Sequence, residues 1–302
     1  MGIVPLPEWH MFWSTDSHFQ NLTFKEVMSR DRFFKISQHL HISDNDDKST
    51  VSDKLGKIRP MITALQKSFR TSWNPSYNIS IDEGVIKCQN RTSLKQRMPD
   101  KPEKYGLKIY KLCDEHGYLV NFEIYDGLTK KTDNEDDEEK IEDTYTAGVV
   151  KKLLQHIKGA HPHHLFADNW YTTIKLVADL KRQNIYYTGT LRSDAKFIPK
   201  DLRSAELTGR YKWEFRTGSP QLLLIKWKDT KVLYLISSAH IADTKKVLRR
   251  QKGQVARQET EIPTAAADYN DHMGSVDTTT KCAPTTIILA DFIDGGNQYS
   301  II

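Results

Sequence analysis

Hydrophobic residues recur at helical spacing in the first quarter of the chain. Apolar positions three and four residues apart predict a helix that opens near Leu22, a second that starts after Ser29, and a third over 54–72. The third helix should end near Pro75, because proline cannot extend a helix and disfavours helical backbone in the residue before it. We therefore expect a polar, helical N-terminal segment over residues 1–75.

The pattern changes to strict alternation at Ile79. Ile79 and Ile81 alternate with polar residues, which places Asp82 in the middle of a strand, on the face opposite Ile81. Two further alternating segments, 108–113 and 118–125, are joined by Asp-Glu-His-Gly, which is typical of a β-hairpin.

Helical and strand patterns then alternate along the chain. An amphipathic helix over 149–157, a short apolar strand over 164–167, a helix over 174–180 and a strand over 185–190 follow one another. Asp168 directly follows the short strand. This order predicts an α/β fold with a mixed sheet and flanking helices, whose first part spans residues 76–191.

Short strands dominate the next region, residues 192–262. The segments 210–216, 222–227 and 232–237 predict a compact all-β insertion. The stretch 245–258 is rich in Lys and Arg and poor in apolar residues, so we interpret it as an exposed basic linker. A helix over 265–280 would return to the core as its second part, residues 263–281, and residues 282–302 form an unrelated tail.

Composition narrows the class of protein. The chain has 302 residues, enough for about two domains. No apolar run approaches the ~18 residues of a membrane span, so we expect no membrane association. The three cysteines include no CxxC pair, which indicates free thiols in a reducing compartment, and no zinc is expected.

The net charge is unevenly distributed. The chain carries +5, but the segment DNEDDEEKIED at 133–143 holds eight acids and one Lys and contributes −7. The other residues therefore carry +12, which favours a protein that binds a polyanion such as nucleic acid. The alternative is an ordinary solvated surface with one acidic loop.

Three aspartates interrupt apolar elements. Asp82 lies within a strand, Asp168 closes a strand, and Asp277 lies on the last predicted helix. An isolated buried carboxylate is costly, and converging carboxylates can relieve that cost by holding Mg²⁺ or Mn²⁺, which prefer oxygen ligands. The alternative for any one of them is a strand-end cap or a surface residue.

Basic side chains gather in two places, where they can contact a DNA backbone. They are Arg91, Lys95, Arg97, Lys101, Lys104 and Lys108 in the first place and Arg249 and Arg250 in the second. A solvated basic loop is the alternative for both. Trp170, two residues after Asp168, is interpreted as a packing residue, with stacking on an extruded base as the alternative.

Four sequence blocks, in this order, resemble the transposase domain of the piggyBac family. They are SIDE at 80–83 with KQRMP at 95–99 and KPEKYG at 101–106; DNWYT at 168–172 with YTGTLR at 187–192; WKD at 227–229 running into ISS at 236–238; and YN at 269–270 with MGSVD at 273–277. The resemblance extends over residues 1–281.

This resemblance implies a ribonuclease-H-like fold in which Asp82, Asp168 and Asp277 form a metal-binding catalytic triad using Mg²⁺ or Mn²⁺. It implies metal-dependent DNA strand cleavage and transfer, with transposon ends and TTAA targets as partners. It further implies a homodimer, an N-terminal segment that serves dimerisation or DNA binding, and a nuclear location in preference to a cytoplasmic one.

The same resemblance indicates a chain truncated at both ends. We expect a degenerate or domesticated transposase domain. The alternative is a non-catalytic, transposase-derived protein that binds DNA or other partners.

Overall fold

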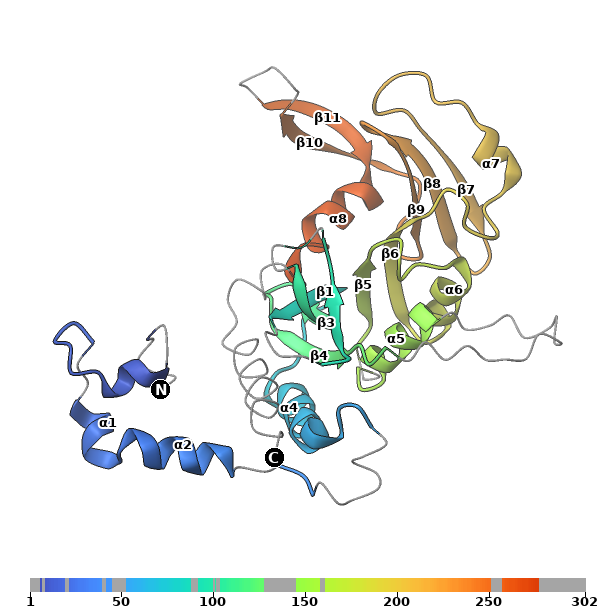
Figure 1. Cartoon of the computed structure of the whole chain (residues 1–302). Helices are drawn as coiled ribbons and strands as arrows, with labels where there is room; N and C mark the ends of the chain where they lie inside the picture. The colour runs from blue at the N-terminus through green and yellow to red at the C-terminus, as the bar shows by residue number, and fades with distance from the viewer. Residues whose placement is uncertain are drawn as a thin grey trace. The chain divides into compact units, whose positions relative to one another are not determined.

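A computed structural model of the chain defines its architecture (Figure 1). It describes residues 6, 9–19, 22–39, 42–44, 53–87, 92–99, 101, 104–127, 145–157, 161–250 and 257–276. The chain divides into two compact units, of which the first includes the residues up to Ile62 and the second begins at Thr63.

The first unit contains short helices around a cluster of aromatic rings. Its elements are η1 (Trp9–Trp13), α1 (Leu22–Val27), α2 (Arg30–Gln38) and η2 (Gly56–Ile58). The ring of Trp13 lies 5.1 Å from that of Phe33 and 6.4 Å from that of Phe24, and its Nε1 donates to the carbonyl of Met28 at 2.9 Å. The predicted helix after Ser29 is confirmed, since the Ser29 side chain caps α2 by accepting from the amide of Arg32.

One large mixed sheet organises the second unit. In the described ranges its nine strands are β1 (Asn78–Lys87), β2 (Lys95–Arg97), β3 (Tyr105–Asp114), β4 (Leu119–Ile124), β5 (His163–Ala167), β6 (Ile185–Leu191), β7 (Trp213–Gly218), β8 (Leu222–Lys228) and β9 (Val232–Ser237). The strand order is β2-β3-β1-β5-β6-β9-β8-β7, and β4 also pairs with β3. β1, β5 and β6 run parallel and the other pairs are antiparallel, which confirms the predicted mixed sheet.

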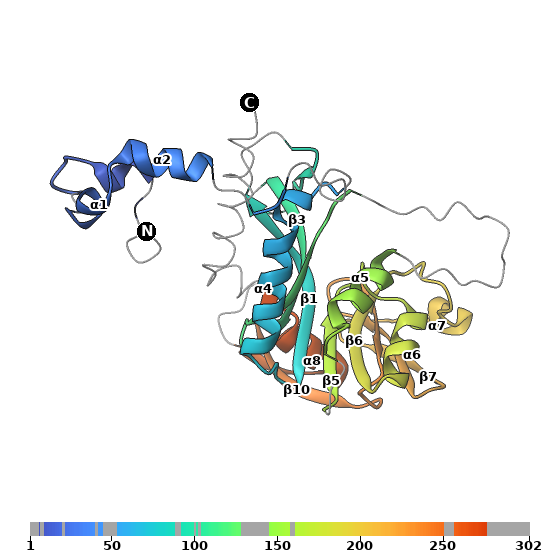
Figure 2. The same ribbon diagram turned by 90° about the horizontal axis from the view of Figure 1, so that it is seen from below.

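Helices cover both faces of the sheet. On one face, α5 (Tyr145–Leu154) and α6 (Ile174–Arg182) bury their apolar stripes against residues such as Ile81 and Leu112. On the other face, α4 (Arg59–Ser72) brings Phe69 within 6.1 Å of the ring of Phe122 in β4. Figure 2 shows α4 on one side of β1 and both α5 and α6 on the other.

A last helix, α8 (Thr264–His272), lies on the same face as α4. Its His272 ring is 5.0 Å from the ring of Phe166 in β5, and its alanines pack against β8 and β9. The helix ends at His272, a turn follows at Met273 and Gly274, and Ser275 and Val276 are helical again. The predicted helix is therefore interrupted by a turn, and its last residues, 277–280, lie outside the described residues.

The strands β7, β8 and β9 confirm the three strands that were predicted for the all-β insertion. They continue the main sheet, because β9 pairs with β6 through Thr188 and Ser237. A short helix, α7 (Lys200–Ser204), precedes them.

The basic linker expected over 245–258 is wrong for its described residues. β10 (Thr244–Arg250) and β11 (Arg257–Pro263) pair as a two-stranded antiparallel ribbon (Figure 1). Lys246, Leu248 and Arg250 are exposed, while Val247 and Arg249 are half-buried on the other face. The sequence did not predict β10 because charged residues occur on both of its faces, although only one face is half-buried.

Candidate functional site

Asp82 and Asp168 lie side by side on two neighbouring parallel strands. Ile81 of β1 pairs with Ala167 of β5. Asp82 directly follows Ile81, and Asp168 directly follows Ala167. Because paired residues in neighbouring strands point to the same face, both carboxylates project from the face that α4 and α8 cover. The sheet therefore joins two residues that are 86 positions apart in the sequence.

The two carboxyl groups are partly withdrawn from water. The pKa of Asp82 is raised to about 6, mainly by burial and also by the negative charges of Glu83 and Asp168, while the Glu83 amide and Lys101 oppose the rise. Burial also raises the pKa of Asp168, against hydrogen bonds from the Trp170 and Tyr171 amides. Like charges held together at a half-buried site are a feature of cation-binding and catalytic centres.

Backbone amides orient the two carboxylates. Oδ1 of Asp82 accepts from the amide of Glu83 at 2.7 Å, and Oδ1 of Asp168 accepts from the amide of Trp170 at 2.9 Å. These bonds fix both side chains before any ligand arrives. In the described ranges, no group of three or more His, Cys, Asp or Glu side chains is arranged to hold a metal ion.

The third predicted ligand, Asp277, lies outside the described residues, and so does Arg91. The residue before Asp277, Val276, is described and is buried. The helix that leads to it, α8, lies on the same face of the sheet as the two aspartates. The described structure therefore brings together two of the three predicted carboxylates.

Two tyrosines border the aspartates, and neither was singled out for a role by sequence reasoning. Tyr269 of α8 hydrogen-bonds with Thr190, and burial raises its pKa to about 12, with contributions from Asp168 and Asp82. Tyr171 is fully buried, and its hydroxyl has no hydrogen-bond partner in the described structure. Its pKa is raised by burial and by Glu83, Asp82 and Asp168. The sequence signal for both is their place in the blocks around Asp168 and Asp277.

The predicted DNA-binding cations occupy different environments. Lys95 and Arg97 lie on β2, where they pair with Leu107 and Tyr105 of β3. Lys101 donates to the backbone carbonyl of Glu83 at 3.1 Å, and Lys104 is exposed. Lys101 therefore contacts β1, the strand that carries Asp82, while β3 separates Lys95 and Arg97 from it.

Lys108 and Arg249 make contacts within the protein. The ammonium of Lys108 lies 2.9 Å from Oε1 of Glu83. The guanidinium of Arg249 lies 2.9 Å from Oδ2 of Asp229 and 5.3 Å from the ring centre of Trp227, so it anchors the ribbon to β8. Arg250, the next residue, is exposed.

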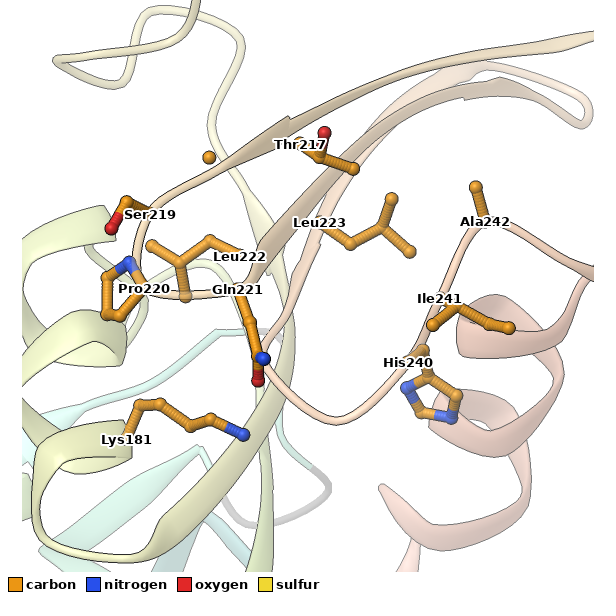
Figure 3. A pocket seen from close by; sticks show the side chains of 11 residues that line it. Lys181, Thr217, Ser219, Pro220, Gln221, Leu222, Leu223, His240, Ile241 and Ala242 are labelled. Atoms are coloured by element: carbon orange, nitrogen blue, oxygen red, sulfur yellow. The ribbon is translucent and has the colours of Figure 1, made fainter.

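A cavity of about 710 Å³ lies away from the aspartates, which do not line it (Figure 3). Its walls come from Lys181 of α6, from the turn between β7 and β8, and from the loop after β9. The Lys181 ammonium donates to the carbonyl of Ser238 at 2.9 Å, and His240 hydrogen-bonds with Asp268, so these two polar groups are already satisfied.

None of the helices in the described ranges combines the length and hydrophobicity that a bilayer-spanning segment requires.

Comparison with known proteins places these features in context. The family described as Transposase IS4 matches residues 1–285. PiggyBac transposable element-derived protein 3 of Homo sapiens is 29% identical over 282 residues, covering 91% of this chain and 46% of that protein. PiggyBac transposable element-derived protein 2 of Homo sapiens is 26% identical over 283 residues, with the same coverage. The chain thus spans about half the length of the curated relatives it matches.

A solved structure shares the fold. The chain resembles the piggyBac transposase in a cryo-EM structure of its synaptic complex with hairpin DNA, with a TM-score of 0.70 and 24% identity. The match covers 95% of this chain and 61% of that one. The predicted ribonuclease-H-like fold class is confirmed by this likeness.

Proposed function

We propose, since the chain belongs to the piggyBac-type transposases of the Transposase IS4 family, that its aspartates perform metal-dependent cleavage and transfer of DNA strands. The observation that carries this proposal is the adjacency of Asp82 and Asp168 on parallel strands. Asp277, which follows buried Val276, is the proposed third member of the triad.

Mg²⁺ or Mn²⁺ fits the donor set. Such ions are commonly bound through one or two carboxylates together with substrate phosphates. Both carboxylates are half-buried, and the negative charge of Asp168 helps to raise the pKa of Asp82. When bound, the metal would activate the attacking oxygen and stabilise the leaving oxygen of a phosphodiester. Asp82, Asp168 and Asp277 would hold it.

The chain's own groups prepare the site for this role. With a pKa of about 6, Asp82 is largely ionised at neutral pH and can serve as a ligand. The amides of Glu83 and Trp170 hold the carboxylates in place, so that less order has to be created on binding. The ammonium of Lys101 keeps positive charge beside Asp82 where a phosphate would approach.

A nicking assay tests this function. Supercoiled DNA carrying TTAA-flanked ends is incubated with the full chain and Mg²⁺ or Mn²⁺, and Mn²⁺ binding is measured by electron paramagnetic resonance. Asp82→Asn and Asp168→Asn should abolish nicking and weaken Mn²⁺ binding. Asp271→Asn, at an exposed position of α8, is the matched control and should behave as wild type. Nicking that survives Asp168→Asn would refute the assignment.

The second candidate function is DNA binding without catalysis, and the ribbon favours it. Arg250 and Arg257 lie directly opposite each other across β10 and β11, and both are exposed. Like charges at opposed positions destabilise a strand pair, and a phosphate between them would relieve the repulsion. On the same face Lys246 is 3.5 Å from Glu259, so its charge is already countered.

Salt dependence tests the ribbon. Each lost phosphate contact lowers the slope of log affinity against log salt by about 0.9. The double change Arg250→Gln with Arg257→Gln should lower the slope by about 2, and Lys246→Gln serves as the control on the same face. A slope that stays unchanged in the double variant would remove the ribbon from the DNA interface.

The same test extends to Lys95 and Arg97 of β2 and to Lys101 and Lys104, which follow this strand. We propose that they contact the DNA backbone together with Arg91. By kinship, we propose transposon ends and TTAA targets as the DNA, a homodimer formed through residues 1–75, and work in the nucleus. Sedimentation of the chain with and without residues 1–75 separates a dimer from a monomer.

A further inference from the structure

The ammonium of Lys108 lies among three groups of the second unit. It is 2.9 Å from Oε1 of Glu83, 4.6 Å from the ring centre of Trp170 and 5.1 Å from that of Tyr110. The side chains of Lys108 and Glu83 are only 22% and 16% exposed. A cation that is partly withdrawn from water interacts more strongly with both a carboxylate and an aromatic face.

These partners belong to the two segments that carry the aspartates. Glu83 is the residue after Asp82 on β1, and its amide donates to Asp82. Trp170 follows Asp168 by two residues, and its amide donates to Asp168. Lys108 therefore bridges the side chains of the same two residues whose amides orient the carboxylates.

The bridge approaches from the opposite face of the sheet. Tyr110 pairs with Glu83 across β3 and β1, and Lys108 pairs with Val85, so Lys108 reaches Glu83 diagonally on their shared face. The ring of Trp170 stacks on that of Tyr110, with centres 5.4 Å apart and planes 15° from parallel. The Lys108 ammonium therefore contacts both rings of this stack, and Trp170 has a neighbouring ring and a neighbouring cation to hold it.

We propose that Lys108 is a positioning residue that clamps the Asp82 and Asp168 segments together, instead of a contact to the DNA backbone. The clamp itself stands on the contacts above, while its consequence for metal binding rests on the proposed function. Groups that orient metal ligands indirectly typically change metal affinity about 10- to 100-fold when removed.

The experiment compares Lys108→Met, Lys108→Arg and Lys196→Met in the full chain. Lys108→Met should weaken Mn²⁺ binding, measured by electron paramagnetic resonance, at least about tenfold. Lys108→Arg should restore most of it, because Arg keeps both the ion pair and the aromatic contact. Lys196→Met removes an exposed cation of the same unit and should leave Mn²⁺ affinity unchanged.

A second readout separates the clamp from a DNA contact. The slope of log DNA affinity against log salt should be the same in Lys108→Met and wild type. A Lys108→Met protein that binds Mn²⁺ as wild type does and loses about 0.9 from this slope would overturn the proposal.

A double-mutant cycle tests the clamp without metal or DNA. The denaturant midpoints of Lys108→Met, Glu83→Gln and the double variant should be non-additive, because each single change removes the same contact. Additive midpoints would refute the clamp. A wild-type chain that binds no Mn²⁺ would refute the proposed function instead, and the cycle would still decide the clamp.

Discussion

The Nε2 atom of His240 lies 2.9 Å from Oδ2 of Asp268, and this contact ties the loop after β9 to α8. The other ring nitrogen of His240 is 2.8 Å from Oγ of Ser237, which hydrogen-bonds with Thr188 at 2.8 Å. Thr188 in turn lies 2.8 Å from Nε2 of His164 in β5. A chain of polar side chains therefore fixes α8, the helix that carries Tyr269, to three strands of the sheet.

Breaking this chain at Asp268 should destabilise the protein. Asp268→Ala removes the hydrogen-bond partner of Nε2 of His240, and we expect a loss of about 1–3 kcal/mol in the free energy of unfolding. Chemical denaturation measures it. Lys245→Met is the control, because Lys245 touches the same carboxylate at 3.6 Å from a half-exposed position and should cost under ~1 kcal/mol. Equal losses in the two variants would contradict a special role for His240.

His164 should make stability depend on pH. The pKa of His164 is lowered to about 3, mainly by burial and also by His240 and His272, while Asp268 opposes the change. The unfolded chain takes up a proton below about pH 6.5 while the folded chain does not, so this stability is present above that pH and is lost on acidification. Between pH 7 and 4.5 the loss should be about 2–3 kcal/mol.

Denaturation series at several pH values check this dependence. His164→Gln should flatten the profile between pH 7 and 4.5, since glutamine keeps a polar group near Thr188 but does not titrate. His161→Gln, at an exposed position, should leave the profile as it is. A profile that keeps its slope in His164→Gln would assign the dependence to other groups.

Gly189 of β6 should tolerate no side chain. A Cβ there would lie 2.6 Å from the carbonyl oxygen of Ala167 and 2.7 Å from Oγ1 of Thr172, both beside Asp168. Gly189→Ala should therefore cost about 1–3 kcal/mol and weaken Mn²⁺ binding. Gly148→Ala, in α5 with no atom within 4 Å, should instead be neutral or stabilise by up to ~1 kcal/mol. Thermal unfolding of the two variants makes the comparison.

Arg249 should hold the ribbon in place. Its ion pair with Asp229 is about three-quarters buried, and its guanidinium covers Trp227. Arg249→Gln should speed amide hydrogen exchange in β10 and β11 about tenfold or more, because a charged hydrogen bond contributes about 1.5–3 kcal/mol. Arg250→Gln should leave exchange unchanged, and similar protection in both variants would exclude Arg249 as the anchor.

Local periodicity was enough to predict most of the elements. Alternation at Ile79 and Ile81 placed Asp82 within a strand and fixed the face it occupies, since successive strand residues point to opposite sides. The apolar stripes of α5 and α6 likewise predicted both helices. The ribbon was missed because both faces of β10 carry cations. The turn at Met273 and Gly274 was missed because the apolar pattern of the last predicted helix continues through it.

The sequence by itself determined that Asp82 lies within its strand and that Asp168 directly follows its own, and the resemblance of its blocks indicated the family. Only the tertiary structure decided that Asp82 and Asp168 are neighbours, because strand pairing joins residues 86 positions apart and no local pattern encodes it. The same reason applies to the cations. Lys108 and Arg249 look like Lys104 and Arg250 in the sequence, and packing alone turns the first two inward to Glu83 and Asp229.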